Sequence, residues 1–369
     1  MYNQTHPKIA LVHDYLTQEG GAEMVLKILC KIFPKAPLFT LFYFPQNVDP
    51  FFKKVNIQTS FLQKYTRIIK NYQLFLNLMP RAIENLNLMN YDIVISSSSA
   101  FAKGIITSPE SKHICYCHTP TRYLWSDTHD YLKELKYNFL IKKFIPKVIH
   151  RLRQWDYLAA QRVDKFLANS KNIQNRIQKY YHRESEIIYP PVDCQKFQIS
   201  KKRKYYFLTG GRLVAYKRFD LAIKVFNKLG WPLKIFGTGP QTQSLKQISK
   251  PNIEFLGYVP EEKLKIIYSQ AKAFIHPQKE DFGITSIEAQ ASGVPVIAYN
   301  AGGSKETILP EQTGILFNEQ NYILLKNAVL EFNEKEKNFN PELIREHAMK
   351  FDKEVFIKKI STLLQNTTK

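Results

Sequence analysis

The stretch FIHPQKEDFGITSIEAQASGVPVIA, residues 274–298, constrains the fold of this chain more than any other. It predicts a strand, a loop, a helix, a turn and a second strand. A βαβ unit of this kind brings loop amides and a helix N-terminus to the carboxyl end of a strand, where open α/β sheets bind anions. The stretch therefore predicts an anion-binding site in an α/β fold.

Two glutamates flank this loop. Glu280 precedes the helix and Glu288 lies two turns along it, with seven residues between them. Carboxylates only accept hydrogen bonds, so Glu280 suits the hydroxyls of a ligand at the loop and Glu288 suits a ribose. Two acceptors beside an amide-lined anion site fit a nucleotide sugar. The alternative is that both glutamates complement the helix dipole or solvate the helix surface.

Length predicts two domains. The chain has 369 residues, about twice a typical domain, and its 44% hydrophobic content is globular. The double proline Pro190-Pro191 stiffens the chain and predicts the linker between two Rossmann-like lobes.

Composition limits the compartment and the partners. No apolar run reaches the roughly 18 residues of a membrane-spanning helix, and residues 1–15 lack a signal-peptide pattern, so we expect a cytoplasmic location. The four cysteines form no CxxC pair and are expected to be reduced packing residues. A net charge of +21 indicates attraction to a membrane, a nucleic acid or a phosphorylated substrate.

In the first lobe, the strand at 8–13 leads into Gly20-Gly21 and a helix. The glycines would let the backbone approach a ligand, although a tight turn explains them equally well. A second strand, 112–117, delivers His118 at its carboxyl end, where it would face the ligand crevice. A structural histidine is the usual alternative. On the acceptor side we expect Arg122, Tyr123 and Trp125, which follow His118, and Asp14, which follows the first strand.

In the second lobe, a strand ending in Gly210-Gly211 is followed by Arg212 and Lys217. A departing nucleoside diphosphate gains negative charge as the glycosidic bond breaks, and preorganised cations stabilise that charge most in the transition state. Arginine suits bidentate phosphate contact and lysine acts as a point charge. In a chain this basic, two solvated loop cations are the simpler alternative.

Two segments combine basic and aromatic residues. Residues 51–83 carry six Lys or Arg and no acid, and residues 131–165 carry nine Lys or Arg against three acids. Both predict a surface that rests on anionic lipid. For part of 51–83, helices that pack their apolar residues inward are at least as good an explanation. Nucleic acid would suit the charge, but the sequence has none of the nucleic-acid-binding signatures.

EDFGITSIEAQASGVPVIA resembles the E-x7-E signature of the large retaining glycosyltransferase family 4, which has the two-domain GT-B architecture. The similarity extends to HDYLTQEGGAEMVL, YDIVISSSSAFAKG, ICYCHTPTRYLW, GGRLVAYKRFDLAI and FLGYV. These segments resemble the subgroup that builds bacterial surface polysaccharides, often mannosyltransferases.

The resemblance implies an α/β GT-B fold with two doubly wound, Rossmann-like lobes facing a central cleft. Residues 1–190 would form the acceptor-binding lobe with the membrane-facing segments, and residues 191–350 the nucleotide-sugar-binding lobe. A C-terminal helix within 351–369 would return to the first lobe. The implied reaction transfers a hexose, with mannose from GDP-mannose as the best choice, to a lipid-linked oligosaccharide with retained configuration.

Roles carried over from the family follow the matching positions. Arg212 and Lys217 would grip the diphosphate, Glu280 would contact the donor sugar, and Glu288 would bind the ribose. His118 would face the transferred sugar. Backbone approaches to the donor would come from two loops: Gly20 and Gly21 in the first, and Phe282, Gly283, Ile284 and Thr285 in the second.

No DxD motif occurs in the sequence, so the resemblance implies metal independence and no cofactor. Front-face attack, with the leaving diphosphate taking the acceptor's proton, is the expected mechanism. The enzyme would be peripheral on the inner face of the cell membrane, with no nucleic-acid partner. Two alternatives remain: a nucleotide-sugar epimerase on the same scaffold, or a non-catalytic relative that binds membrane or nucleic acid.

Overall fold

A computed structural model describes residues 7–67, 72–128 and 139–367. The chain divides into two compact lobes. The N-terminal lobe comprises Met1–Tyr189 and Ile357–Lys369, and the C-terminal lobe comprises Pro190–Phe356. The chain first passes from one lobe to the other at the double proline. It returns within the last helix.

The N-terminal lobe is built on a parallel sheet of seven strands within the described residues. Its order is β3-β2-β1-β4-β5-β6-β7. The strands are β1 (Ile9–His13), β2 (Leu38–Thr40), β3 (Ile57–Thr59), β4 (Ile93–Ser98), β5 (Lys112–Cys117), β6 (Lys165–Ala168) and β7 (Ser185–Ile187). Connections leave β1 in one direction and β4 in the other, which makes the β1–β4 boundary the topological switch point.

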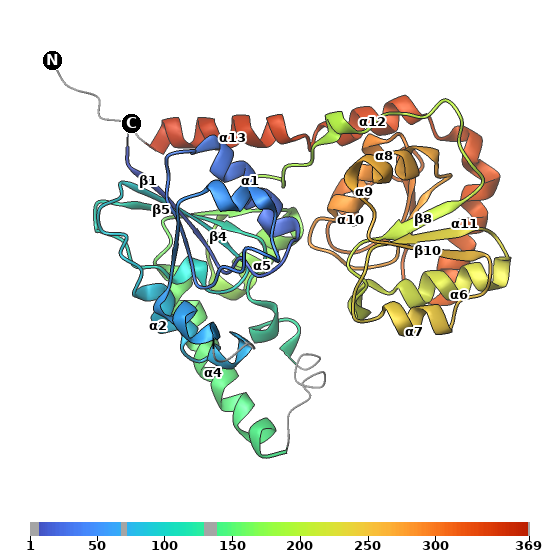
Figure 1. Ribbon diagram of the computed structural model, residues 1–369. Helices are drawn as coiled ribbons and strands as arrows, with labels where there is room; N and C mark the ends of the chain where they lie inside the picture. Colours follow the sequence, from blue (N-terminus) through green and yellow to red (C-terminus); the bar gives the residue numbers. More distant parts are fainter. Residues whose placement is uncertain (1–6, 68–71, 129–138, 368–369) are drawn as a thin grey trace. The chain divides into compact units, whose positions relative to one another are not determined.

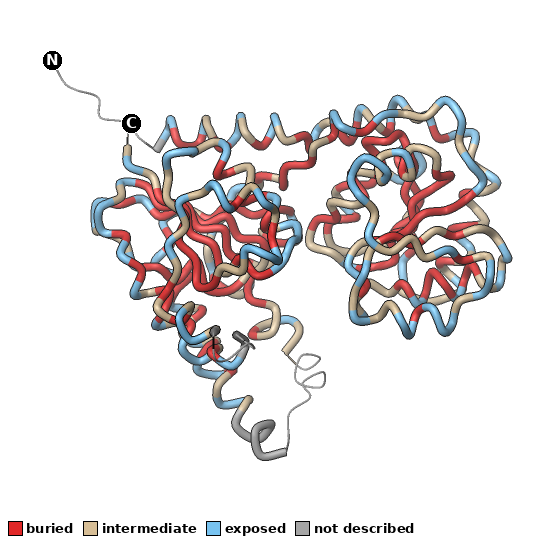
Figure 2. Tube along the Cα trace, in the orientation of Figure 1, coloured by how far each residue is buried: buried red, intermediate tan, exposed pale blue. Residues whose placement is uncertain are grey.

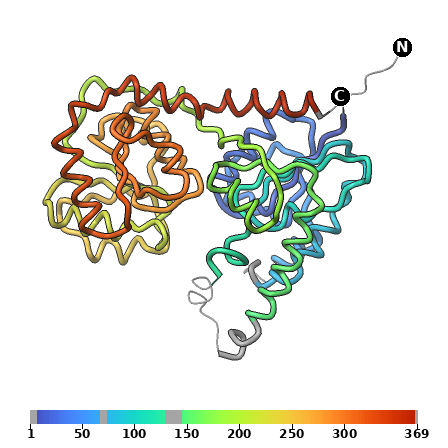
Figure 3. Tube along the Cα trace, turned by 180° about the vertical axis from the view of Figure 1, so that it is seen from behind, coloured from blue at the N-terminus to red at the C-terminus, as the bar shows by residue number. Residues whose placement is uncertain are grey.

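Helices flank this sheet (Figure 1). They are α1 (Gly21–Ile32), α2 (Met79–Glu84), α4 (Phe139–Gln161), α5 (Lys171–Tyr181) and the C-terminal α13 (Lys353–Thr367). Short 3-10 helices join them: η1 (Pro50–Lys54), η2 (Phe61–Arg67), η3 (Tyr72–Phe75), η4 (Ala102–Gly104) and η5 (Arg122–Leu124). From Ile357 onward α13 belongs to the N-terminal lobe, along which it runs (Figure 3).

Burial follows from the parallel arrangement. A parallel sheet is covered on both faces, so its central strands are rich in apolar residues and almost entirely buried. Figure 2 shows this as a red centre in each lobe. In β4 and β5, however, burial extends to polar residues such as Ser96, Ser97 and His113, each of which must find a hydrogen-bond partner.

A buried ion pair joins η4 and α4 in the N-terminal lobe. Nζ of Lys103 in η4 lies 2.5 Å from Oδ1 of Asp156 in α4, and both side chains are 1% exposed. The same carboxylate accepts from the Thr121 hydroxyl at 2.7 Å, the Trp125 indole at 2.8 Å and the Tyr181 hydroxyl at 2.8 Å. Because the charges are fully compensated, this network can hold η5 and the loop before it on α4.

The C-terminal lobe has a parallel sheet of six strands within the described residues, in the order β10-β9-β8-β11-β12-β13. They are β8 (Phe207–Gly210), β9 (Leu233–Phe236), β10 (Ile253–Gly257), β11 (Phe274–His276), β12 (Val296–Tyr299) and β13 (Gly314–Phe317). This is the Rossmann order, and its switch point lies between β8 and β11.

Figure 1 shows α6 and α7 on one face of the second sheet and α8 and α9 on the other. The helices are α6 (Phe219–Leu229), α7 (Thr242–Gln247), α8 (Glu261–Gln270), α9 (Ile284–Ala291), α10 (Ser304–Thr307), α11 (Tyr322–Lys335) and α12 (Pro341–Met349). The 3-10 helices are η6 (Cys194–Lys196), η7 (Ala215–Lys217) and η8 (Glu336–Asn338). Phe207, Phe226 and Phe332 join α6, β8 and α11 in one apolar core.

Several expectations from the sequence are confirmed. Residues 274–298 form β11, α9 and β12 in the predicted order, and residues 112–117 are β5. All four cysteines are buried and free: Cys30, Cys115, Cys117 and Cys194. Strands β2, β3 and β13 are additions that the sequence did not indicate, because three or four residues carry little periodicity.

Inward packing explains part of the two basic-aromatic segments. Phe52, Leu62 and Phe75 are buried in the N-terminal core, as are Ile149 and Leu152 of α4. Lys70 and residues 131–138 lie outside the described residues, and so do the side chains of Arg67 and of residues 139–144. Within the described parts of the chain, none of the helices combines the length and apolar character needed to cross a membrane.

Candidate active site

The C-terminal candidate residues gather at the switch point of their sheet. β8 and β11 are neighbours, so the loop after Gly210 and the loop after His276 both leave at the edge where the crossovers diverge. Arg212 and Lys217 follow β8, and Glu280 follows β11. The sheet order therefore brings together residues that are more than sixty positions apart in sequence.

Lys217 and Glu280 form an ion pair. Nζ of Lys217 lies 2.8 Å from Oε1 of Glu280, and the two side chains are 12% and 18% exposed. The pKa of Lys217 is raised: burial opposes the charged form, but the attraction of Glu280 and of Tyr216 outweighs it. The ammonium folds back over the strand end, since a Cβ added to Gly211 would lie 3.2 Å from it. Arg212, which precedes Lys217 in the same loop, is exposed.

Helix α9 begins at the same place with a bare N-terminus. Its N-cap is Gly283, whose φ of 96° lies in the left-handed region and whose lack of a side chain leaves the first amides without a side-chain cap. Ile284 and Thr285 open the helix. The side chain of Phe282 is buried and packs edge-on against Phe351 with ring centroids 5.5 Å apart, and the donor contact expected of its backbone amide remains a prediction.

The loop after β12 supports Glu280. The Gly303 amide donates to the Glu280 carbonyl at 2.8 Å, and a Cβ on Gly302 would lie only 2.1 Å from that oxygen. A side chain at either glycine would push the DFGIT loop away. The sequence showed these two glycines only as the end of a strand.

Glu288 lies in α9, the helix that follows the Glu280 loop. The Tyr268 hydroxyl in α8 donates to its carboxylate at 3.0 Å. Burial raises the pKa of Glu288 to about 7, although the Tyr268 hydrogen bond opposes the shift. A carboxyl with a pKa near neutrality in the helix that follows a candidate binding loop is typical of a functional residue.

His276 is a member of this site that sequence reasoning missed. It ends β11 in a fully buried position, and a Cβ on Gly283 would lie 3.2 Å from its Nε2. Its Nδ1 lies 3.0 Å from the Gln278 amide, while none of the described residues hydrogen-bonds to Nε2. Burial lowers the pKa of His276 to about 4, so the ring is neutral at pH 7.

In the N-terminal lobe, Asp14 has a structural task. Its carboxylate accepts from four backbone amides, those of residues 99 to 102, at 2.6 to 2.9 Å. A carboxylate has about four acceptor positions, and all four are used here. The acceptor-binding role expected for Asp14 remains a prediction, whereas the geometry makes it the anchor of the turn after β4.

His118 stands at the carboxyl end of β5, as predicted, and is only 9% exposed. Its Nε2 lies 2.8 Å from the hydroxyl of Ser97 in β4. Nearby, Gly20 is the N-cap of α1 and supplies no side-chain cap, so the first amides at Gly21 are open to an anion. Glu23 in the same turn lies 3.7 Å from His13.

The aromatic residues expected to bind an acceptor are partly engaged in packing. The Trp125 ring stacks on Tyr180 with centroids 5.2 Å apart, and its N–H donates to Asp156. Tyr123 packs against the N-terminal core. Arg122 opens η5 and is half-buried. Their contact with an acceptor remains a prediction.

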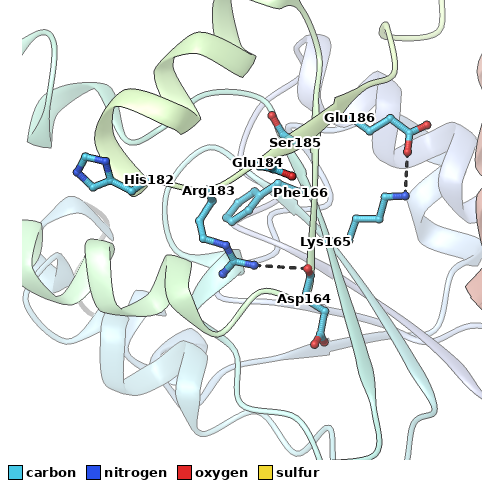
Figure 4. A pocket seen from close by; sticks show the side chains of 8 residues that line it. All are labelled: Asp164, Lys165, Phe166, His182, Arg183, Glu184, Ser185 and Glu186. Carbon is cyan, nitrogen blue, oxygen red and sulfur yellow. Dashed lines mark hydrogen bonds and ion pairs between the residues drawn. The ribbon is translucent and has the colours of Figure 1, made fainter.

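A pocket of about 710 Å³ lies elsewhere in the N-terminal lobe, at the edge strand β7 (Figure 4). Its charges serve the fold: Lys165 pairs with Glu186 at 2.8 Å, and Arg183 donates to the Val163 and Asp164 carbonyls. No sequence-predicted site residue lines it. In the described residues, no group of three His, Cys, Asp or Glu side chains is arranged to hold a metal ion.

Each lobe thus carries its own set of candidate residues at its own switch point. Two family models match these two halves. The model of Glycosyltransferase Family 4 matches residues 19–196, and that of Glycosyl transferases group 1 matches residues 193–353. The fold class is that of a two-lobed α/β glycosyltransferase. The chain belongs to the family 4 and group 1 glycosyltransferases of GT-B fold.

Relatives with curated descriptions match parts of the chain. The O-antigen chain mannosyltransferase RfbU of Salmonella typhimurium is 30% identical over 207 residues, which are 52% of this chain and 57% of RfbU. A GDP-mannose-dependent alpha-(1-6)-phosphatidylinositol monomannoside mannosyltransferase of Mycobacterium tuberculosis is 28% identical over 40% of this chain and 46% of its own length. The chain thus spans about half the length of the curated relatives it matches.

Solved structures match over the whole chain. The crystal structure of Anabaena Alr3699/HepE in complex with UDP and glucose superposes with a TM-score of 0.72 at 16% identity, covering 98% of this chain and 100% of HepE. At this identity the likeness shows the fold alone. It confirms the GT-B architecture that the sequence motifs implied.

The raised pKa of Glu288 predicts a pH effect on stability. The folded protein holds this proton more tightly than the unfolded chain, whose carboxyl has the ordinary pKa of 4.5. The free energy of unfolding should therefore fall by about 3 kcal/mol as the pH rises through the window from about 4.5 to about 7. Glu288→Gln keeps the acceptor for Tyr268 but removes the titration. Urea unfolding of both proteins across pH should show that the free energy of unfolding of the variant increases relative to that of the wild type as the pH rises. Parallel profiles would contradict the prediction.

Proposed function

We propose that this protein is a retaining, metal-independent glycosyltransferase that moves a hexose from a nucleotide sugar to a lipid-linked oligosaccharide in surface-polysaccharide synthesis. Family membership supports the reaction class. The observation that carries the proposal is the Lys217–Glu280 ion pair beside the bare N-terminus of α9.

The ion pair suits a donor with a diphosphate next to a sugar. An ammonium stabilises the phosphate oxygens, and the carboxylate beside it accepts from sugar hydroxyls. When the two groups bind such a donor, Lys217 exchanges a carboxylate for phosphate oxygens, and Glu280 exchanges an ammonium for sugar hydroxyls. Without the donor the two charges neutralise each other, which limits the desolvation cost of keeping a partly buried Lys217 ready.

Amides at the start of α9 add to the same anion site. The helix dipole and the uncapped N–H groups after Gly283 favour negative charge there. Arg212 is exposed and follows β8 at the same edge of the sheet. These groups supply positive potential where a leaving diphosphate would gain charge, which is the task that a metal ion performs in other transferases. Glu288, with a pKa near 7, would accept from the ribose.

The mechanism we propose is front-face attack. The bond from the anomeric carbon to the diphosphate oxygen breaks while the bond to the acceptor oxygen forms on the same face. The acceptor's proton passes to the departing diphosphate oxygen, so no protein base is needed. Glu280, paired with Lys217, is held for binding rather than for nucleophilic attack.

Front-face attack predicts that no sugar becomes covalently attached to Glu280. A slowly reacting fluorinated donor would accumulate a glycosyl-enzyme if a carboxylate were the nucleophile. Intact-mass spectrometry after incubation with this donor should match the mass of the untreated protein. An added hexose that peptide mapping places on Glu280 would refute the mechanism without refuting glycosyl transfer.

Mannose from GDP-mannose is the proposed donor. It is supported by two relatives, the O-antigen chain mannosyltransferase and the GDP-mannose-dependent mannosyltransferase. The HepE structure holds UDP and glucose, so the shared fold accepts more than one base. The donor therefore has to be determined by binding.

A thermal-shift panel tests the donor class. GDP, UDP, ADP and their sugar conjugates are added without metal, and a ligand at about 100 times its Kd should stabilise the folded protein by about 2.7 kcal/mol. We expect GDP and GDP-mannose to give this shift and Arg212→Ala to lose it. The control is Arg218→Ala, because Arg218 pairs with Asp220 at 3.0 Å and should leave the shift intact. A response to UDP alone would change the donor, and no response to any nucleotide would refute the function.

Membrane association is the part of the proposal that concerns the N-terminal lobe. Three apolar side chains near α2 are well exposed: Leu74 at 59%, Tyr65 at 49% and Leu78 at 45%. Exposed basic residues accompany them in the same segment, namely Lys53, Lys54, Lys64 and Arg81. Apolar side chains among cations suit the interface of an anionic bilayer, where a lipid-linked acceptor would be found.

Charge reversal tests this surface. Lys53, Lys54 and Lys64 changed together to Glu should weaken sedimentation with phosphatidylserine vesicles by roughly a hundredfold, since each surface lysine contributes about 1 kcal/mol. The matched control reverses three exposed lysines of the C-terminal lobe, Lys201, Lys202 and Lys204, with the same change in net charge. Equal losses in both variants would show that only the total charge matters and would contradict a membrane-facing segment.

A further inference from the structure

Three buried side chains at the carboxyl ends of neighbouring strands form a chain of hydrogen bonds in the N-terminal lobe. His13 ends β1, Ser97 lies in β4 and His118 follows β5. Nδ1 of His13 lies 3.1 Å from both the carbonyl and the hydroxyl oxygen of Ser97. The same hydroxyl lies 2.8 Å from Nε2 of His118. Because these groups are shielded from water, their protons must be shared among the three side chains and the nearby backbone.

The carbonyl of Ser97 determines the first proton. A carbonyl oxygen can only accept, so Nδ1 of His13 carries a proton and donates it. The Ser97 hydroxyl consequently cannot donate to His13 and shares that N–H as an acceptor. Among the described residues, the remaining partner of this hydroxyl is His118. Ser97 is fully buried, and leaving its proton unpaired would be destabilising. The hydroxyl therefore donates to Nε2 of His118.

This direction decides the tautomer of His118. A ring nitrogen that accepts a hydrogen bond has no proton, so neutral His118 carries its proton on Nδ1. The ring is neutral because burial, followed by the nearby charge of His13, lowers the pKa of His118 to about 3. Within the described part of the chain no group hydrogen-bonds to Nδ1. That N–H is therefore left to donate to a ligand.

Glu23 supports the outer end of the chain. Its carboxylate lies 3.7 Å from Nε2 of His13, the ring nitrogen on the side away from Ser97. Glu23 belongs to the first turn of α1, and a Cβ on Gly20 would lie 3.0 Å from its other oxygen. The loop expected to approach the donor phosphates is thus packed on the glutamate that lies beside His13.

We propose that Ser97 and His13 are positioning residues that hold His118 with its proton on Nδ1, so that His118 serves as a hydrogen-bond donor and not as a base. Its use in sugar transfer rests on the proposed function, whereas the tautomer itself does not. A donor at this position fits front-face attack, in which the leaving diphosphate takes the acceptor's proton. The N–H of His118 would bind an oxygen of the sugar or of the acceptor.

Histidine ring nitrogens report the tautomer directly. In protein labelled with ¹⁵N-histidine, long-range proton–nitrogen spectra distinguish a protonated Nδ1 from a protonated Nε2, and comparison with His118→Asn assigns the signals. We expect His118 protonated on Nδ1 at neutral pH, and a shift toward the Nε2–H form in Ser97→Ala. The matched control is Ser96→Ala, because the Ser96 hydroxyl lies 2.8 Å from Nε2 of His113 on the same two strands. It should change the His113 signals and leave those of His118.

A second pair of variants tests His13. Asparagine can place an amide N–H near the position of Nδ1, so His13→Asn should retain the His118 tautomer, whereas His13→Leu should lose it. If circular dichroism shows that Ser97→Ala does not fold, this pair decides the question. With active enzyme, Ser97→Ala and His13→Leu should lower kcat about tenfold, as for a lost hydrogen bond, with little change in KM.

Two outcomes would overturn the proposal: a wild-type His118 protonated on Nε2, or an unchanged tautomer in both Ser97→Ala and His13→Leu. One further result would distinguish failure of the proposed function from failure of the positioning role. If the tautomer behaves as expected but no nucleotide binds and no sugar is transferred, the positioning role of Ser97 and His13 stands and the proposed function fails.

Discussion

Chain connections that diverge from the middle of a parallel sheet determine where this protein can bind a ligand. In each lobe the strand order reverses direction once, between β1 and β4 and between β8 and β11. Right-handed crossovers on opposite faces leave the loops at those boundaries uncovered at the carboxyl ends of the strands. Every predicted donor-site residue except Glu288, which lies along α9, is on such a loop or at the start of the helix that follows it.

The electrostatics of the C-terminal lobe follow from this placement. Loops at a switch point are only partly exposed, so a single charge there would pay a desolvation penalty. Lys217 and Glu280 avoid it by pairing, and each is suited to a different part of a nucleotide sugar. Among the described residues, Glu288 has a hydroxyl partner but no cation at hydrogen-bond distance, and burial raises its pKa.

The N-terminal lobe meets the same constraint with neutral groups. Burial of the strand ends makes an unpaired polar atom costly, and the Asp14 carboxylate accepts from four amides while the Ser97 hydroxyl hydrogen-bonds to two histidines. Such a network has few permitted proton arrangements, because each donor needs an acceptor. The demand for satisfaction in the core thereby selects one tautomer of His118 at the edge where a ligand would bind. Stability and chemistry are served by the same hydrogen bonds.

Local sequence was sufficient for the elements and for residues whose position depends on one loop. The DFGIT loop, the glycine before α9 and the strand that delivers His118 are readable because apolar runs, glycines and their spacing act over a few residues. The sequence likewise indicated Arg212, Lys217, Glu280 and Glu288 as site residues, through a family motif that spans one βαβ unit and a strand end. Their binding roles remain predictions.

Only the tertiary structure decided which distant residues meet. Nothing local pairs Lys217 with Glu280, Asp14 with the turn at 99–102, or His13 with Ser97 and His118, because these contacts depend on strand order, which the sequence pattern does not encode. Strand order likewise placed Gly302 against Glu280 and buried Lys103 on Asp156. The sequence by itself determined the layers, the loops and the kinds of charge at their ends. The packing of parallel strands determined which of those charges and protons face one another, because hydrogen bonds and ion pairs act only over a few ångströms.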